Sequence, residues 1–381
     1  MAGWASLPSD LVRSVGDLLL ATNDIDCYLD MRAACRSWRS ATAKQHRAAN
    51  LRLRPRRWVM LDEGDHNVDG RLFVNVSTGR FLRRRCIPLL RDHFLVTTSD
   101  GLLVLGDRNR PYYGTARVLN PLTGLSVSFA VEVPHGVSGP EFAAVGGSSE
   151  PTLVFFVDHG EECGDEVLCA DPTSERFREQ SLPGTVAPAS VVAYAGDVYV
   201  ACDNGAVYRG VGRVKRWHSE PIIAADTSPE AAKAWMWAAC CCLVESDGEL
   251  LLVRRSRGSS DVFKVDFERK ALERVESIGG RALFLGDRCL SVNADKLPSV
   301  DGGSVYYTDG AQNIYRYDMK DGIEEEIPGF RARPFTLLQL LLAYCEDLPY
   351  GRECNDRSFV EPTKAVRPKM GDIDNDRCIV L

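Results

Sequence analysis

A strand–turn unit that returns at nearly even intervals limits the fold of this chain most. Each copy is a short apolar run that ends in Asn or Asp and a polar turn. Five copies place that residue at Asn75, Asn120, Asp171, Asp266 and Asp318. The steps are 45, 51, 95 and 52 residues, and the long step is close to two units, with 206–210 as a degenerate copy in the gap. Repeats of about 40–50 residues, each with several strands, are typical of propeller blades.

The residues between these turns favour antiparallel strands. From Trp58 onward short β-rich runs alternate with Gly, Asp, Asn and Pro. The clearest runs are 71–76, 102–106, 152–157, 198–202, 250–254 and 304–308. In the turns, Asn or Asp can accept hydrogen bonds from the following backbone, and Gly supplies a positive φ. We therefore expect about six four-stranded blades over residues 55–335, with a generic β-sandwich repeat as the alternative.

The first fifty residues follow a helical period instead. Leu11, Val15 and Leu18 recur at helical spacing and predict a first helix over about 8–20. The sequence therefore places a small helical domain in residues 1–50, ahead of the β-rich body.

A second helical stretch follows capping residues at 23–26. Its side chains Tyr28, Met31, Cys35 and Trp38 fall on one stripe. Two or three short helices cannot bury such faces alone. They need either the rest of the chain or a partner, so a simple cap on the larger domain is the alternative to partner binding.

Two motifs in these helices resemble the F-box. A Leu-Pro pair is followed by an acid and Leu, and about 25 residues later comes a run with Arg, Cys and Trp-Arg. In that family the segment binds the Skp1 adaptor, which links to a cullin ubiquitin ligase. The residues that the resemblance assigns to adaptor contact or packing are Leu7, Pro8, Leu11, Val15, Cys35 and Trp38. Two departures are mild, Val15 where Ile is common and Ala34 where Val usually precedes the Cys.

The β-rich body resembles a second family. The runs 282–292 and 303–309 are similar to the C-terminal domain of a large group of plant F-box proteins of the KIB type, regarded as a β-propeller. The resemblance extends over most of 1–330 and includes the order of the parts. It implies the substrate receptor of an SCF-type ubiquitin ligase, an adaptor subunit with no catalytic site or cofactor of its own. It does not identify the target protein.

Composition narrows the partners and the compartment. The net charge of −7 argues against bulk nucleic-acid binding, although residues 1–58 are +5 and the remainder is −12. The thirteen cysteines are scattered and odd in number, which fits a reducing cytoplasm or nucleus. No secretory signal is visible, and the apolar run 336–344 is too short to span a bilayer.

Candidate chemical sites in the body are weak. His159, Cys163 and Cys169 lack paired CxxC spacing and a fourth ligand, so a surface loop with one buried cysteine is favoured over a metal site. Three adjacent thiols at 240–242 cannot easily ligate one ion, because consecutive strand residues point to opposite faces. We expect no metal and no cofactor.

Residues 345–381 leave the repeat pattern, and their apolar content is too low for independent folding, which predicts a disordered tail. The last four residues, beginning at Cys378, fit a prenylation motif, and the final Leu favours a geranylgeranyl group. One lipid chain beside the acids at 372–376 anchors only marginally. Peripheral membrane association and an unmodified tail both stay open.

Together these patterns predict an α+β multi-domain chain, with an all-α F-box, an all-β propeller and a disordered tail. The favoured function is recognition of a protein target for a ubiquitin ligase. One alternative is a propeller hydrolase with an accidental helical N-terminus. The other is a membrane-tethered propeller scaffold without a ligase role.

Overall fold

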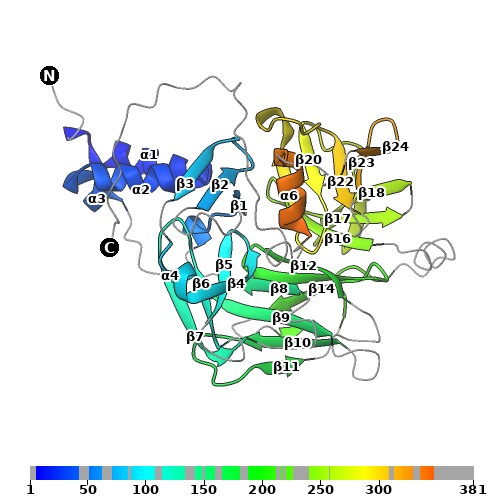
Figure 1. The fold of residues 1–381 in the computed structure, drawn as a ribbon, viewed down its shortest axis with the longest axis horizontal. Coiled ribbons are helices and arrows are strands. Elements are labelled where there is room, and N and C mark those ends of the chain that lie inside the picture. The colour runs from blue at the N-terminus through cyan, green and yellow to red at the C-terminus, as the bar shows by residue number, and fades with distance from the viewer. Residues whose placement is uncertain are drawn as a thin grey trace.

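The computed structural model places a group of helices beside a ring of β-sheets (Figure 1). It describes residues 6–42, 51–61, 71–84, 87–107, 114–133, 142–147, 151–158, 165–180, 188–211, 216–217, 220–225, 240–256, 258–308, 313–327, 329 and 335–346.

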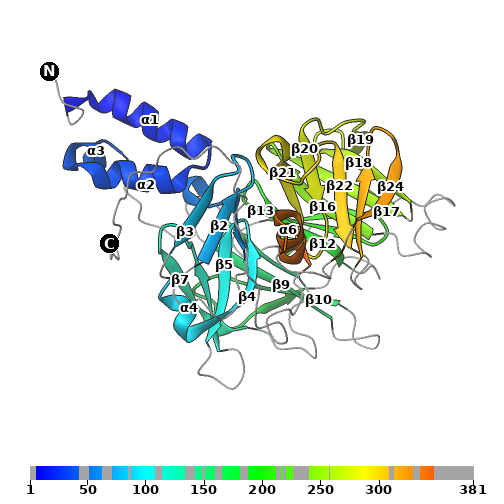
Figure 2. The ribbon, with the colours of Figure 1, turned by 45° about the horizontal axis from the view of Figure 1, so that its top comes forward.

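Six sheets form the ring, which confirms the predicted propeller (Figures 1 and 2). The first three blades consist of β1 (Trp58–Leu61), β2 (Arg71–Asn75) and β3 (Phe81–Arg84); β4 (His93–Ser99), β5 (Leu102–Asp107), β6 (Thr115–Leu119) and β7 (Ser126–Glu132); and β8 (Phe142–Gly146), β9 (Thr152–Asp158), β10 (Asp165–Ala170) and β11 (Arg178–Gln180). The last three consist of β12 (Pro188–Tyr194), β13 (Asp197–Cys202), β14 (Val207–Val211) and β15 (Arg216–Trp217); β16 (Cys240–Ser246), β17 (Glu249–Ser256), β18 (Ser259–Asp266) and β19 (Ala271–Arg274); and β20 (Arg281–Phe284), β21 (Leu290–Asn293), β22 (Ser304–Thr308), β23 (Ile314–Asp318) and β24 (Ile323–Ile327).

The repeated Asn or Asp lies at the turn before the outermost strand in five blades. In the first blade, Asn75 Oδ1 accepts hydrogen bonds from the N–H groups of Ser77 at 3.0 Å and Thr78 at 3.1 Å. Equivalent bonds form at the turns that begin with Asn120, Asp171, Asp266 and Asp318. The predicted turn chemistry is therefore confirmed, and it explains why one residue type recurs at the spacing of a blade.

The fourth blade carries the degenerate copy in a different arrangement. Residues 206–210 form most of β14, as expected of the repeat. The side chain that supports a turn here is Asn204, whose Oδ1 accepts from the N–H of Ala206 at 3.0 Å, so it precedes the strand instead of following it. Part of the connection after β14 lies outside the described residues.

The first and last blades depart from the expected four strands, with three and five. In the second blade, Leu119 before the outer turn pairs with Leu103 at the start of β5. In the first blade, Asn75 pairs in the same way with Trp58 at the start of β1. Strand β1 therefore corresponds to β5, the second strand of its blade, and among the described residues the first blade has no equivalent of β4.

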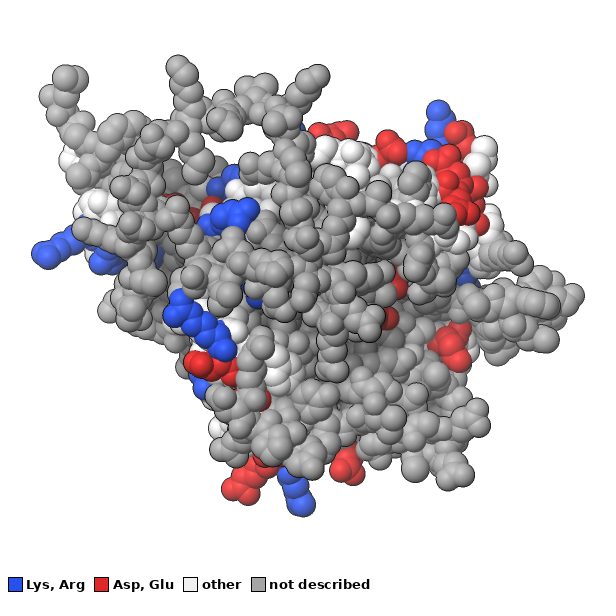
Figure 3. Space-filling model, viewed as in Figure 1, with Lys and Arg blue, Asp and Glu red and all other residues white. Residues whose placement is uncertain are grey.

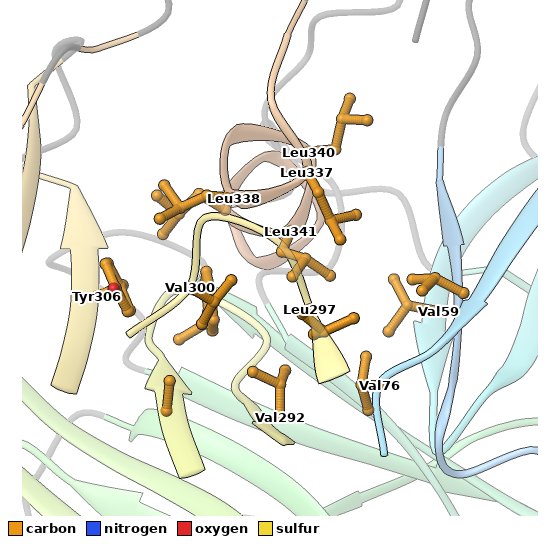
Figure 4. Packing of buried hydrophobic residues seen from close by; sticks show 14 of the residues in the cluster. Val59, Val76, Val292, Leu297, Val300, Tyr306, Leu337, Leu338, Leu340 and Leu341 are labelled. Atoms are coloured by element: carbon orange, nitrogen blue, oxygen red, sulfur yellow. The ribbon is translucent and has the colours of Figure 1, made fainter. Parts of the chain in front are cut away.

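A helix closes the ring between these two blades. Helix α6 (Leu337–Cys345) packs against β1 of the first blade and against β20 and β22 of the last. Its leucines share one apolar cluster with Val59 and Val76 on one side and Val292 and Tyr306 on the other (Figure 4). Because Thr336 and Gln339 cap each other at its start, the helix begins at a defined residue. The apolar run 336–344 thus belongs to the core of the propeller.

The N-terminal helices lie at the edge of the first blade (Figures 1 and 2). They are α1 (Ser9–Ala21), α2 (Ile25–Ala34) and α3 (Arg36–Ala41), followed by a 3₁₀ turn, η2 (Leu51–Leu53). Two further short helices, α4 (Leu89–Asp92) and the 3₁₀ turn η3 (Ala294–Lys296), lie in connections. The first predicted helix is confirmed. The second is interrupted, because Cys35 is extended, with φ −155° and ψ 162°, and separates α2 from α3.

Candidate docking surface and its junction with the propeller

Helix α1 presents a row of exposed apolar side chains. Leu11, Val15 and Leu18 are 50%, 49% and 65% exposed, and they repeat every three or four residues along one side. Pro8 is exposed just before the helix, and Leu7 beside it is half-buried. Among the described residues only Leu95 and Ile323 are other large apolar side chains with comparable exposure. We call Leu7, Pro8, Leu11, Val15 and Leu18 the α1 row.

The opposite side of α1 is packed closely. Val12 is 3% exposed and Gly16 is buried. A Cβ atom at Gly16 would lie 3.2 Å from the side chains of Met31 and Tyr28, so the glycine allows α1 to approach α2 closely. The row is therefore exposed on a helix whose position is fixed from behind.

The remaining predicted adaptor residues, Cys35 and Trp38, lie at the α2–α3 junction and not in the row. Cys35 is the N-cap of α3, and its Sγ accepts from the backbone N–H of Trp38 at 3.4 Å. Hydrogen bonds from the Ser37 hydroxyl and from this N–H lower the pKa of the Cys35 thiol. Trp38 packs against the cluster that includes Ile25 and Tyr28. These two residues shape the helical group from which the row projects.

Helix α2 finds its apolar partner in the first blade. Ile25, Tyr28 and Met31 are buried in one cluster with Trp58 and Phe73 of the propeller. The sequence predicted that these helices need either the rest of the chain or a partner to bury their apolar faces. The propeller covers α2, and the α1 row is left uncovered.

Asn23 locks the helices to the segment that enters the propeller. Its Nδ2 donates to the Arg54 carbonyl at 2.7 Å, and its Oδ1 accepts from the N–H of Arg57 at 3.1 Å. Its own carbonyl accepts from Trp58 Nε1 at 2.9 Å. Asn23 holds a φ of +58°, a backbone conformation that asparagine tolerates better than most residues.

Arg80 adds a charged clamp at the same place. Its guanidinium, on the outer turn of the first blade, lies 2.7 Å from a carboxylate oxygen of Asp24 and 2.7 Å from one of Asp26. It also stacks over the Trp58 ring, with 5.3 Å from Cζ to the centroid. A planar guanidinium can serve two carboxylates and a ring at once, which an ammonium group cannot do equally well.

Arg54 extends the junction to the second and third blades. Its side chain is 1% exposed and donates to the carbonyls of Val145 at 2.9 Å and Gly147 at 2.8 Å, beside Asp100. Burial lowers the pKa of this guanidinium, and the Asp100 charge opposes that effect. Asn23, Arg54 and Arg80 carry no sequence motif, so no pattern along the chain could identify them.

Comparison with protein families shows what this arrangement belongs to. The family model of the KIB1-4 beta-propeller matches residues 73–323, which is well over half of the chain. The chain belongs to the KIB1-4 beta-propeller family. No curated protein matches the chain.

Solved structures that resemble the KIB1-4 propeller do so distantly. TolB from Acinetobacter baumannii is 11% identical over 71% of this chain and 62% of its own, with a TM-score of 0.34. The dihydro-heme d1 dehydrogenase NirN is 13% identical over 71% of this chain and 53% of its own, with a TM-score of 0.32. The AfRom2 CNH domain is 13% identical over 72% of this chain and 88% of its own, with a TM-score of 0.34. The matched part thus spans less than two thirds of TolB and of NirN.

The axis of the KIB1-4 propeller holds a cavity of about 120 Å³. It is lined by residues of β4, β12, β16 and β21 and by Arg56 and Arg57 of the entering segment. Burial, and then the nearby Asp100 charge, raise the pKa of Glu245 on β16, while Arg56 and Arg57 oppose the rise. Acidic and basic side chains thus both line the cavity.

The structure places the weak chemical candidates as follows. Cys169 is buried, whereas His159 and Cys163 lie outside the described residues. Cys241 and Cys242 are buried in separate apolar clusters, as expected of neighbours on a strand. Within the described ranges, no three His, Cys, Asp or Glu side chains are grouped so that they could hold a metal ion.

Two observations bear on the predicted tail. Cys345, the first residue of the predicted tail, is the last residue of helix α6 and is buried. Glu346 directly follows the helix. Cys378 lies outside the described residues, so its prenylation stays a prediction. None of the described helices is both long enough and apolar enough to cross a membrane.

Proposed function

We propose that this KIB1-4 family member is the substrate receptor of an SCF-type ubiquitin ligase, in which the α1 row docks on a Skp1-like adaptor. The observation that carries the proposal is the row itself. Three large apolar side chains stay about half exposed or more on a helix that the chain packs from the other side. The row also contains four of the six residues that the F-box resemblance assigns to the adaptor.

The energetics of the row fit a partner surface. Full burial of a leucine or valine side chain stabilises by roughly 1.5–3 kcal/mol. Covering three half-exposed side chains therefore offers an adaptor about 3 kcal/mol before polar contacts are added. Uncovered, the exposed parts of these side chains contribute nothing to the fold, so their presence at helical spacing favours a docking role over a simple cap.

The second part of the proposal concerns the propeller, which would hold a protein target. A receptor has to hold its target at a fixed place relative to the ligase core. The contacts of Asn23, Arg54 and Arg80, which fix the helices against the propeller, support this role of the propeller. On this proposal the chain performs no chemistry, works in the cytoplasm or nucleus, and needs no cofactor. The ubiquitin-charged enzyme of the ligase modifies the target.

A pull-down with purified Skp1 tests the proposal. We expect the wild type to bind, and we expect the pairs Leu7→Ala with Pro8→Ala and Leu11→Ala with Val15→Ala to lose at least about tenfold in affinity, since 1.4 kcal/mol is a factor of ten. Ile323→Ala is the matched control, because that side chain is 60% exposed on β24, away from the helices. No binding by the wild type, or equal losses in the control, would refute the adaptor role.

A further inference from the structure

The basic residues of the chain are distributed unevenly between lysine and arginine. Of 46 basic residues only nine are lysines, and none lies between Lys44 and Lys215. That stretch of 170 residues contains 18 arginines, whereas an even spread would place about four lysines there. A general preference for arginine therefore does not account for where the nine lysines are.

The structure maps this bias onto one side of the ring. The lysine-free stretch forms all of the first three blades, which we call the lysine-free arc, and β12 to β14 of the fourth. The described lysines, Lys264, Lys270, Lys296 and Lys320, belong to the last two blades, and of these Lys296 lies at the border with the arc, where its backbone carbonyl approaches Gly79. The helices lie beside the first blade, and the last two blades lie at the other end of the long axis (Figure 1). The arc also contacts the junction, through Trp58, Phe73 and the Arg54 partners.

Packing does not explain the absence of lysine from the arc. Arg54 and Arg80 do need a guanidinium, because each serves several acceptors at once. Arg176 and Arg178 in the third blade, by contrast, are exposed. At such positions an ammonium group on a flexible stem carries the same charge at nearly the same stability, since surface substitutions usually stay within about 0.5 kcal/mol.

We infer that the lysine-free arc protects the receptor from its own ligase, an inference that rests on the proposed function. In ubiquitin transfer the ε-amine of a lysine attacks the thioester carbon, an amide bond forms, the enzyme thiolate leaves, and the amine proton passes to solvent. A guanidinium stays protonated at physiological pH and does not act as this nucleophile. A receptor is tethered to the ubiquitin-charged enzyme at a high effective concentration for as long as the ligase is assembled. Its target, by contrast, binds only transiently. Any lysine within reach would therefore compete with the target.

Only one side of the receptor then lies within reach of the ubiquitin-charged enzyme. The arc faces the ubiquitin-charged enzyme, and the parts of the last two blades that carry Lys264, Lys270 and Lys320 do not. The basic and acidic side chains visible in Figure 3 show that charge as such is present at both ends of the molecule. What differs between the two sides is the chemical identity of the basic group.

Charge-conserving substitutions test this directly. The first variant carries Arg176→Lys and Arg178→Lys in the arc, and the matched control carries Arg269→Lys and Arg274→Lys in the fifth blade, where the side chains are 75% and 63% exposed. Each full-length protein is bound to Skp1, cullin and the ring subunit and given ubiquitin and its activating and conjugating enzymes. Ubiquitin on the receptor is quantified by immunoblot and mapped to individual lysines by mass spectrometry.

We expect the arc variant to gain at least about threefold in ubiquitin on the receptor, mapped to the new lysines, with little change in the control. Equal modification of both variants, or none on the new arc lysines while the same ligase discharges its enzyme onto free lysine, would overturn the inference and leave the receptor function standing. A wild type that fails to bind Skp1 refutes the proposed function itself, and the inference falls with it. Unchanged melting temperatures verify that both variants fold.

Discussion

Arg80 joins helix α2 to the first blade by serving Asp24, Asp26 and the Trp58 ring together. The side chains of Asp24, Asp26 and Trp58 are less than half exposed. Water therefore does not fully replace their contacts with the guanidinium when the arginine is removed. At this scale the structure shows single residues that hold the two parts of the chain in one arrangement, although none of them belongs to a motif.

Removal of the Arg80 guanidinium should weaken the junction. We expect Arg80→Ala to lower the free energy of unfolding by about 2–4 kcal/mol, because two partly buried carboxylates lose their partner. Arg80→Lys should restore only part of the loss, since an ammonium group cannot span both carboxylates and the ring. Chemical denaturation followed by tryptophan fluorescence measures both.

Arg269→Ala is the control for this change. Arg269 also pairs with two carboxylates but is 75% exposed, so the variant should lose less than about 1 kcal/mol. A loss at Arg80 no larger than the loss at Arg269 would contradict the clamp.

Glu245 in the axial cavity should make stability depend on pH. Burial raises the pKa of Glu245 in the folded state above its value in the unfolded state. At a pH between these two pKa values, the folded state therefore holds more protons than the unfolded state. Stability contributed through this group is therefore greatest below the ordinary carboxyl pKa and falls as the pH rises through the raised value. The charges that face Glu245 are Asp100, Arg56, Arg57 and Arg281.

We expect Glu245→Gln to unfold at a higher denaturant concentration than the wild type at pH 7, and the advantage should shrink toward pH 4. Urea unfolding over that pH range measures the difference. The same advantage at every pH would mean that Glu245 does not titrate as its burial implies.

Helix α6 closes a ring whose first blade, in the part of the chain that the structure describes, has no innermost strand. Leu341 and Leu342 are 0% exposed and belong to the cluster that spans the first and last blades. In propellers generally, the first and last blades have to be joined for the ring to be stable, because an open ring exposes two blade faces. Here an apolar helix performs that joining, so its packing should determine the stability of the whole ring.

Leu341→Ala should therefore cost about 2–5 kcal/mol, the usual range for a leucine truncated in a packed core. Leu18→Ala is the matched control, because it removes the same atoms from a helix in which the side chain is 65% exposed, and it should cost under about 1 kcal/mol. Thermal unfolding measured by circular dichroism reports both. Comparable costs in the two variants would show that α6 does not hold the ring closed.

The whole molecule combines an uncovered apolar row at one end with a propeller, and the junction fixes the two relative to each other. Contacts of α2, the entering segment and the first three blades make the helices and the propeller a single packed unit. The position of the α1 row relative to the blades is therefore set by burial, and a partner bound at the row would stand at a defined place beside the ring.

The predicted membrane attachment concerns the whole chain, and it depends on prenylation of Cys378, which stays a prediction. If the terminal motif is prenylated, the wild type expressed in cells that contain a geranylgeranyl transferase should partition partly into the membrane fraction, and Cys378→Ser should be recovered in the supernatant. Phase separation in detergent followed by immunoblotting measures the two. Identical partitioning of both proteins would rule out the lipid.

Sequence alone determined the class of fold because its signals are local. A side chain such as Asn75 accepts hydrogen bonds two and three residues ahead, so each blade leaves a mark at its own turn, and the spacing of these marks gives six blades. The helical period of Leu11, Val15 and Leu18 likewise predicted α1.

Only the tertiary structure decided which of these residues are covered and what joins the parts. Leu11 and Tyr28 are both apolar and both at helical spacing, yet one is 50% exposed and the other 3%, because Tyr28 packs in the cluster with Trp58 and Phe73 of the first blade and Leu11 lies outside that cluster. The apolar run 336–344 carried no sign that it would close a ring, since its partners in the first blade lie about 280 residues earlier in the chain than the helix itself. Burial depends on neighbours distant in sequence, and no local pattern encodes it.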